Sequence, residues 1–257
     1  MKKEKSRRSP IRWMKDEYKE AFKLFRSIPS LAVAIFVVSV VVMNLMANKV
    51  ILKTEWIALG GGVLVSWIPF LVMDIVTKHF GPKAANRLSL LAIVVNLSCC
   101  LIFYIVTLIG QNEAFDTIFS STWFILIGST IAFILSAITN NYSNEFVGRL
   151  FKKNPNGKLA YIVRTYVSTL VGQFVDNLAF ILPTYMLFAP LIWGPEYGWT
   201  FLQCAMCSLT GAVAELILEA VFAPIGYKIN QKWIREKIGE NYFKSYNPEK
   251  LLEYDYE

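Results

Sequence analysis

Six long apolar stretches constrain the fold of this chain more than any other feature of its sequence. A hydrocarbon core about 30 Å thick needs roughly 20 helical residues to cross it. The stretches that reach this length lie at residues 29–48, 56–77, 88–110, 118–141, 161–188 and 199–222. Only 18% of the residues are charged, against about 25% in soluble proteins. The pattern predicts an all-α membrane protein with six transmembrane helices and disfavours the soluble, fibrous and disordered classes.

The positive charge of the chain is concentrated before the first apolar stretch. The net charge is +7, and the first 28 residues contribute +6 of it. This basic segment is too long for a secretory signal, and no small-residue cleavage site follows it, so the first apolar stretch is predicted to remain as a membrane helix. Apolar and aromatic residues among these lysines allow two alternatives, an amphipathic helix on the anionic inner leaflet or a solvated basic arm.

The loops between the apolar stretches alternate in their content of lysine and arginine. Basic residues occur in the N-terminal segment, between the second and third stretches, between the fourth and fifth, and in the tail, whereas the loops 111–116 and 194–198 contain none. Only Lys49 and Lys53 break this alternation. Because basic loops stay on the cytoplasmic side, both termini are predicted to be cytoplasmic. The predicted division is a basic segment 1–28, a membrane domain 29–226 and a cytoplasmic tail 227–257.

Polar side chains within the apolar stretches are the candidates for a binding site. Such residues are costly at membrane depth and often mark substrate pathways. Five of the six stretches carry one polar stripe at helical spacing, which favours a polar pocket between the helices. The candidates for hydrogen bonding are Asp176, Gln173, Asn140, Asn44, Asn48, Asp74 and Glu215, and those for stacking on a ring are Phe180 and Trp67.

Structural roles remain open for several of these residues. Asparagine and serine side chains commonly hold membrane helices together, and this alternative has equal weight for Asn44 and Asn48. A salt bridge with Lys78 or a helix cap would explain Asp74, and Arg164 could pair with Glu215 or Glu219.

The sequence offers no catalytic, metal or cofactor motif. Cys204 and Cys207 have the spacing of a redox or zinc motif but lie inside an apolar stretch without a second ligand pair. His79 is the only histidine, which disfavours a histidine-activated nucleophile. A phosphate-binding G-x-x-x-x-G-K-[ST] motif is missing, so the chain cannot itself hydrolyse ATP. We expect a non-enzyme without a cofactor or a nucleic-acid partner.

Three segments resemble a known family of membrane importers. They are ANKV at 47–50, DIVTKHFGPKAANR at 74–87 and RTYVSTLVGQFVDNLAF at 164–180, of which the last is the most specific. Together they are similar to the vitamin uptake transporter family, also called the queuosine precursor transporter family, over the first five apolar stretches. The resemblance implies a six-helix importer of the bacterial inner membrane that carries a 7-deazaguanine such as preQ0, preQ1 or queuine.

The chain departs from the family pattern at three positions. Lys78 replaces an acidic residue, and Ala137 and Asn140 replace a glutamine and an aspartate. Gln173 and Asp176 retain an amide and a carboxylate that can match the hydrogen-bonding edge of a guanine. Two alternatives therefore stay open: a family member that imports a different small heterocycle, and the substrate-binding subunit of an energy-coupling vitamin transporter. Transport would run downhill with trapping, couple to an ion, or need an energising module, and a homodimer is a further possibility.

Overall fold

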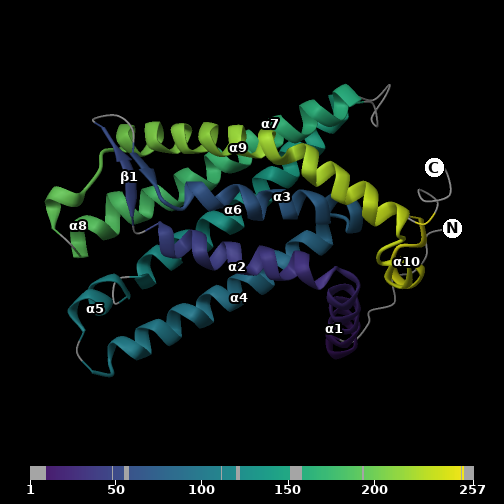
Figure 1. The fold of residues 1–257 in the computed structure, drawn as a ribbon, viewed down its shortest axis with the longest axis horizontal. Coiled ribbons are helices and arrows are strands. Elements are labelled where there is room, and N and C mark those ends of the chain that lie inside the picture. Colours follow the sequence, from purple (N-terminus) through teal and green to yellow (C-terminus); the bar gives the residue numbers. More distant parts are fainter. Residues whose placement is uncertain are drawn as a thin grey trace.

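Long helices run side by side along the longest axis of the molecule, and shorter elements lie at its two ends (Figure 1). The computed structural model describes residues 10–47, 49–54, 58–110, 112–119, 122–150, 158–192, 194–249 and 251. In chain order the elements are α1 (Pro10–Ser27), α2 (Ser30–Met46), β1 (Val50–Lys53), β2 (Ala58–Gly60), α3 (Val63–Phe80), α4 (Pro82–Thr107), α5 (Glu113–Phe119), α6 (Thr122–Leu150), α7 (Lys158–Ile181), η1 (Leu182–Phe188), α8 (Ala189–Ile192), η2 (Pro195–Tyr197), α9 (Phe201–Arg235) and α10 (Glu240–Tyr246).

Several of these helices are long and apolar enough to cross a membrane. Four candidates are complete in the described residues: Val63–Phe80, Pro82–Thr107, Tyr166–Ile192 and Phe201–Arg235. A fifth is α2 taken together with α1, although the two are bent by 101° relative to each other. In α6 the apolar part is shorter, at Ile127–Asn140. A helical, multi-pass membrane protein is therefore confirmed, while the count of six spans stays a prediction.

The outward face of α4 shows why these helices need a lipid environment. Large apolar side chains on it recur at steps of three or four residues and are exposed: Leu90, Val94, Leu97, Leu101 and Ile105. An exposed apolar stripe of this length is unusual on a soluble protein and is expected on the surface of a membrane domain.

Residues 58–60 form a strand, which corrects the prediction of a helix from residue 56. β1 pairs antiparallel with β2, with Leu52 opposite Leu59 and Lys53 opposite Ala58, and α3 begins only at Val63. A short hairpin satisfies the backbone groups of the connection between α2 and α3 without a helix. Gly62 is needed where this connection turns into α3, because a Cβ there would lie 2.9 Å from the carbonyl oxygen of Met43. The hairpin lies at the end of the molecule opposite α1 and α10 (Figure 1).

The predicted fifth span continues past α7 in a different helical form. The chain passes from α7 into a π-helical segment, η1, which contains Pro183 near its start and leads into α8. Proline removes a backbone donor and prevents the regular α-helical pattern from continuing. Short π-helical segments occur frequently at functional sites, and the candidate site described below lies beside this one.

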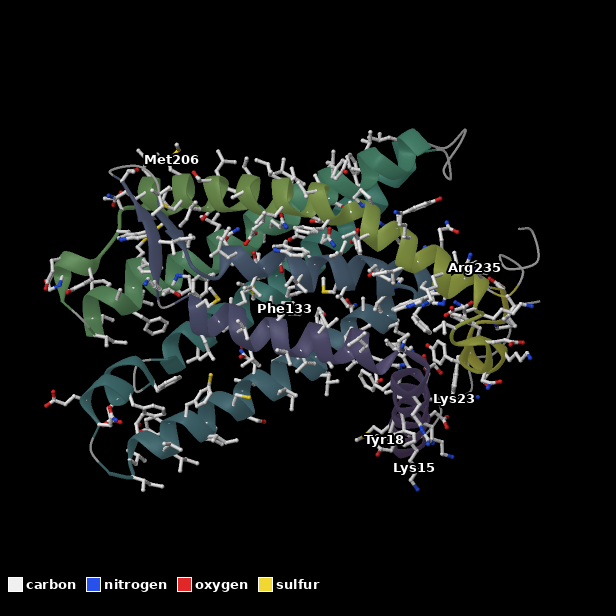
Figure 2. All side chains as sticks on the ribbon, in the orientation of Figure 1. Lys15, Tyr18, Lys23, Phe133, Met206 and Arg235 are labelled. Atoms are coloured by element: carbon white, nitrogen blue, oxygen red, sulfur yellow. The ribbon has the colours of Figure 1, made fainter. Side chains whose placement is uncertain are left out.

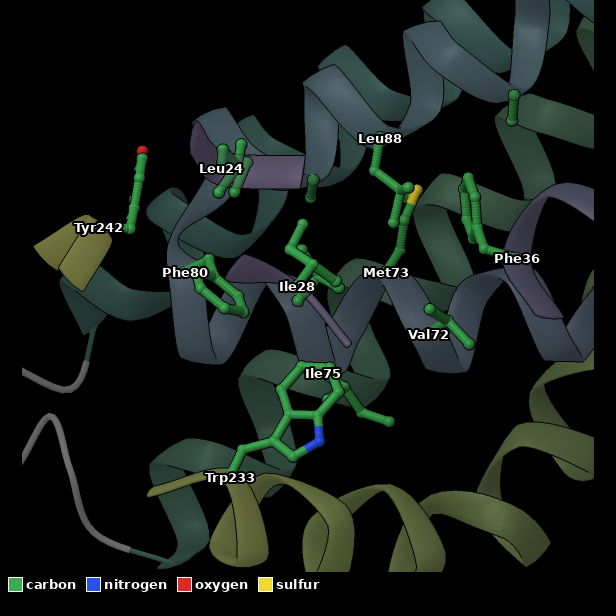
Figure 3. Packing of buried hydrophobic residues seen from close by; sticks show 14 of the residues in the cluster. Leu24, Ile28, Phe36, Val72, Met73, Ile75, Phe80, Leu88, Trp233 and Tyr242 are labelled. Atoms are coloured by element: carbon green, nitrogen blue, oxygen red, sulfur yellow. The ribbon is translucent and has the colours of Figure 1, made fainter. Parts of the chain in front are cut away.

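The main apolar cluster lies where α3, α4 and α9 meet α1 and α10. Leu24 and Phe243 are fully buried there, and Phe80 and Trp233 pack beside them (Figure 3). Tyr242 of α10 donates a hydrogen bond of 3.3 Å to Glu20 of α1. Burial, together with this carboxylate, raises the pKa of Tyr242 to about 12, so its hydroxyl keeps the proton that it donates. The two terminal segments are therefore packed against each other at the same end of the bundle.

Of the two alternatives for the basic N-terminal segment, the helix is confirmed. Residues 10–27 form α1, and Leu24 and Ile28 belong to the buried cluster. Residues 1–9 and 252–257 lie outside the described residues. The cytoplasmic location of both termini and the division at residues 28 and 226 stay predictions.

An ion-pair cluster fixes α1 on the first turn of α4. Arg87 contacts Glu17 and Glu20, with 3.0 Å to the latter, and Lys83 lies 3.0–3.1 Å from the same two carboxylates. The Arg87 and Glu20 side chains are 13% and 14% exposed, whereas Lys83 is 56% exposed. This difference in exposure means that Arg87 contributes more to the stability of the cluster than Lys83 does.

Replacing Arg87 with methionine should lower the free energy of unfolding by about 2–4 kcal/mol, because it leaves the largely buried Glu20 without its main partner. The matched change Lys83→Met should cost less than about 1 kcal/mol, since that ion pair is exposed. Thermal denaturation of the detergent-solubilised variants measures both effects. Equal shifts in Tm for the two variants would contradict this assignment.

Candidate functional site

A cavity of about 90 Å³ lies between α2, α3, α6, α7 and α9, with β2 and η1 at one end. At about 10–15 Å³ per water, it has room for several water-sized groups. The polar side chains in its wall are Asn44, Ser66, Ser129, Asp176, Asn177 and Glu215. The aromatic side chains in its wall are Phe180, Tyr185 and Trp199. Polar groups from five helices therefore meet aromatic rings in one cavity.

Glu215 of α9 is held by donors from two other helices. Its Oε1 accepts a hydrogen bond of 2.6 Å from the Ser66 hydroxyl of α3, and its Oε2 accepts one of 3.1 Å from the amide of Asn177 in α7. The side chain is 4% exposed. A carboxylate has about four acceptor positions, so these two bonds leave others available for a ligand.

Asp176 of α7 is the second carboxyl group of the cavity. Its buried Oδ1 has no hydrogen-bond partner among the described residues. The buried Nδ2 of Asn44 in α2 also has none. Buried polar atoms are nearly always paired with protein or ordered water, so Asp176 and Asn44 each retain unused hydrogen-bonding capacity in the cavity wall.

The aromatic side of the cavity is built around η1 and the start of α9. The rings of Tyr185 and Trp199 stack with centroids 4.3 Å apart and planes at 12°, and the Trp199 backbone N–H donates to the Tyr185 carbonyl at 3.1 Å. This stacked pair is fixed both through its rings and through its backbone. Phe180, one turn before η1, adds a third ring to the same wall. The wall therefore offers flat apolar surfaces for a planar ligand.

Glu219, a further buried carboxyl group, lies one helical turn beyond the cavity. Glu219 of α9 is 2% exposed and receives long hydrogen bonds of 3.4 Å from Thr169 and Gln173 of α7. Glu219 does not line the cavity. Carboxyl groups therefore continue from the cavity toward the end of the bundle that carries α1 and α10.

The structure brings four of the nine predicted site residues to the cavity wall: Asn44, Asp176, Phe180 and Glu215. Gln173 is fully buried behind the wall, where its amide contacts Glu219. Asn140 packs against Gly172 at the α6–α7 contact. The Asp74 carboxylate pairs with Lys78 at 3.1 Å. Asn48 lies outside the described residues.

Trp67 does not line the cavity, and its ring packs elsewhere. It stacks on Phe222 with centroids 3.8 Å apart, and its Nε1 donates to the Leu64 carbonyl at 3.0 Å. A ring that is occupied on one face and hydrogen-bonded through its only donor is a structural contact between α3 and α9.

Asn177, Ser66 and the Tyr185–Trp199 pair line the cavity but were not among the predicted site residues. Asn177 stands four residues after Gln173, so helical spacing alone places it on the predicted polar face. Ser66 lies on the same helical line as Asp74, two turns away, and this line could have pointed to it. The aromatic pair had no signal in the sequence, because it forms only where η1 turns the chain back toward α9.

The cavity wall is rich in hydrogen-bonding groups. Two carboxyl groups and two amides present acceptors and donors, but the cavity wall contains no basic side chain among the described residues. Within the same residues, no group of three histidine, cysteine, aspartate or glutamate side chains is arranged to hold a metal ion. An acceptor-rich wall of this kind favours a ligand that carries several N–H donors.

The family comparison agrees with a membrane domain that binds a small molecule. The model of the family described as "Putative vitamin uptake transporter" matches residues 60–229. This range includes α3, α4, α6, α7 and most of α9, and with them most of the cavity wall. No curated protein and no solved structure shows significant similarity to the chain.

Proposed function

Because the chain belongs to the vitamin uptake transporter family, whose members are membrane transporters of small molecules, we propose that it imports a queuosine precursor or base. The substrate is a 7-deazaguanine: preQ0, preQ1 or a compound similar to queuine. The protein works in the bacterial inner membrane with both termini in the cytoplasm. The observation that carries the proposal is the pair of carboxyl groups, Asp176 and Glu215, in a cavity that also has aromatic walls.

The hydrogen-bonding edge of a 7-deazaguanine complements these carboxyl groups. A guanine-like ring presents two neighbouring N–H donors beside a carbonyl acceptor. The unpaired Oδ1 of Asp176 accepts from such donors, and the unpaired Nδ2 of Asn44 donates to the carbonyl. A site that reads a polar edge in this way rejects analogues that lack it, because its buried groups would then remain unpaired. The aromatic wall stacks on the flat face of the ring.

The proposal is tested by uptake of radiolabelled preQ1 into cells that lack queuosine synthesis and their own importer. We expect uptake above the empty-vector background and queuosine formation in tRNA. Absence of uptake of preQ0, preQ1 and queuine by a correctly inserted protein would overturn the proposal. The proposal would also be overturned if the variant Asp176→Ala transported preQ1 as well as the unaltered protein does.

Glu215, the other carboxyl group of the cavity, predicts a preference between the two precursors. PreQ1 carries an aminomethyl cation, whereas preQ0 has a nitrile in the same place, which only accepts hydrogen bonds. A charge-assisted hydrogen bond contributes about 1.5–3 kcal/mol, so preQ1 should bind at least about tenfold more tightly. Competition of unlabelled preQ0 and preQ1 against radiolabelled preQ1 uptake measures the ratio. Equal competition by the two compounds would contradict the role given to Glu215.

A further inference from the structure

One face of α1 is apolar, exposed and bordered by positive charge. Met14, Tyr18 and Phe22 follow one another at steps of four residues and are 63%, 71% and 54% exposed. Tyr18 stacks on Phe22 with centroids 6.4 Å apart. Beside this stripe are the exposed basic residues Lys15, Lys19 and Arg26, and the Arg26 guanidinium lies 5.4 Å from the centre of the Phe22 ring. We call these six residues the α1 outer face.

The opposite face of α1 is anchored to the rest of the protein. Leu24 is fully buried, and Glu17 and Glu20 pair with Lys83 and Arg87 of α4. Lys23 donates a hydrogen bond of 2.5 Å to Ser245 of α10. Because these contacts fix the rotation of the helix about its axis, the α1 outer face has a defined direction.

The direction of α1 relative to the membrane follows from its bend. The helix lies at 101° to α2, so it runs across the ends of the long helices and parallel to the plane of the membrane that they would span. Tyr18 lies on the side of α1 toward which α4 runs, and Lys23 lies on the side that faces α10 (Figure 2). The apolar stripe of α1 therefore faces the region that lipid would occupy beside α4.

We propose that the α1 outer face binds the surface of a bilayer that is rich in anionic phospholipid. Apolar side chains enter the boundary between headgroups and acyl chains, while the lysines and arginine beside them pair with the anionic headgroups. Charge complementarity selects this occupant, since three cations lie beside the stripe and Glu17 and Glu20 of α1 pair with α4 on the anchored side. This interaction is separate from substrate recognition, because the α1 outer face contributes no residue to the cavity.

The test is hydroxyl-radical footprinting of the full-length protein in nanodiscs, read by mass spectrometry at Met14, Tyr18 and Phe22. Discs of phosphatidylcholine alone are compared with discs made of equal parts of phosphatidylcholine and phosphatidylglycerol. Near an anionic surface, each basic residue raises the constant for membrane association by about fivefold. We therefore expect oxidation at the three positions to fall at least about fivefold in the anionic discs. Tyr246 of α10, which is 41% exposed at the same end of the molecule, serves as the internal reference and should not change.

The charge dependence is tested with the triple variant Lys15→Gln, Lys19→Gln, Arg26→Gln. Its oxidation in anionic discs should return to the level seen in neutral discs, and high salt should do the same for the unaltered protein. The variant Lys228→Gln, Lys232→Gln removes charge from exposed positions of α9 and serves as the matched control. Oxidation that is equal in the two lipids would overturn the proposal, as would protection that the triple variant retains.

Discussion

Asparagine at position 176 should reduce uptake of radiolabelled preQ1 about 100-fold. The change keeps the size of the side chain but replaces the carboxylate, whose Oδ1 is buried without a partner, with an amide. An amide cannot accept from two adjacent N–H donors through both of its ends, and it places an NH2 group against one of them. Losing a charge-assisted pair and leaving a buried donor unmatched costs about 2–3 kcal/mol, which corresponds to about 30- to 150-fold in affinity.

The matched control is Asp74→Asn on α3. This carboxylate pairs with Lys78 at 3.1 Å and does not line the cavity. Uptake at saturating substrate should remain within about threefold of the unaltered protein, because an ion pair of this exposure contributes little. Comparable losses in both variants would mean that membrane insertion or folding is affected, and a loss only at Asp74 would place the site elsewhere.

The cavity could be predicted from helical spacing, but its exact wall could not. The spacing placed polar residues on one face of each helix, and Asn44, Asp176 and Glu215 do converge on one cavity. Gln173 shares that face with Asp176, yet one turn along α7 it is fully buried against Glu219. Spacing gives the direction in which a side chain leaves its helix. The height at which neighbouring helices bring their side chains together depends on packing, which the sequence does not show.

The parts of the fold that the sequence did not predict are those where helices end. Residues 58–60 are apolar enough to extend a helix, but the backbone forms the β1–β2 hairpin, and β2 lines the cavity through Leu59 and Gly60. Pro183 in the sequence indicates a break in the helix, but it does not indicate that the helix continues as the π-helical segment η1. Local sequence fixes such ends weakly, because alternative backbone forms differ by little free energy and tertiary contacts decide between them. Both segments border the cavity, so the least predictable parts of the fold shape the site.

Leucine at position 211 should abolish preQ1 uptake while the protein still folds. Gly211 lines the cavity on α9, and a Cβ at this position would lie 3.2–3.3 Å from the side-chain amide of Asn177. The added side chain would therefore crowd Asn177 and take up space in the cavity that both residues line. Overpacking of this kind costs about 1–3 kcal/mol, which a folded membrane protein tolerates more readily than its substrate site does.

A graded series at position 211 separates occlusion from misfolding. Gly211→Ala adds only the Cβ, so Asn177 must shift by a few tenths of an ångström and the KM for preQ1 should rise with kcat nearly unchanged. Val213→Leu, two residues along α9, enlarges a side chain that is 42% exposed on the outer surface and should transport normally. Thermal denaturation in detergent reports folding for each variant. If Gly211→Leu retained both its Tm and its uptake, the substrate would have to cross the membrane by a route that avoids this cavity.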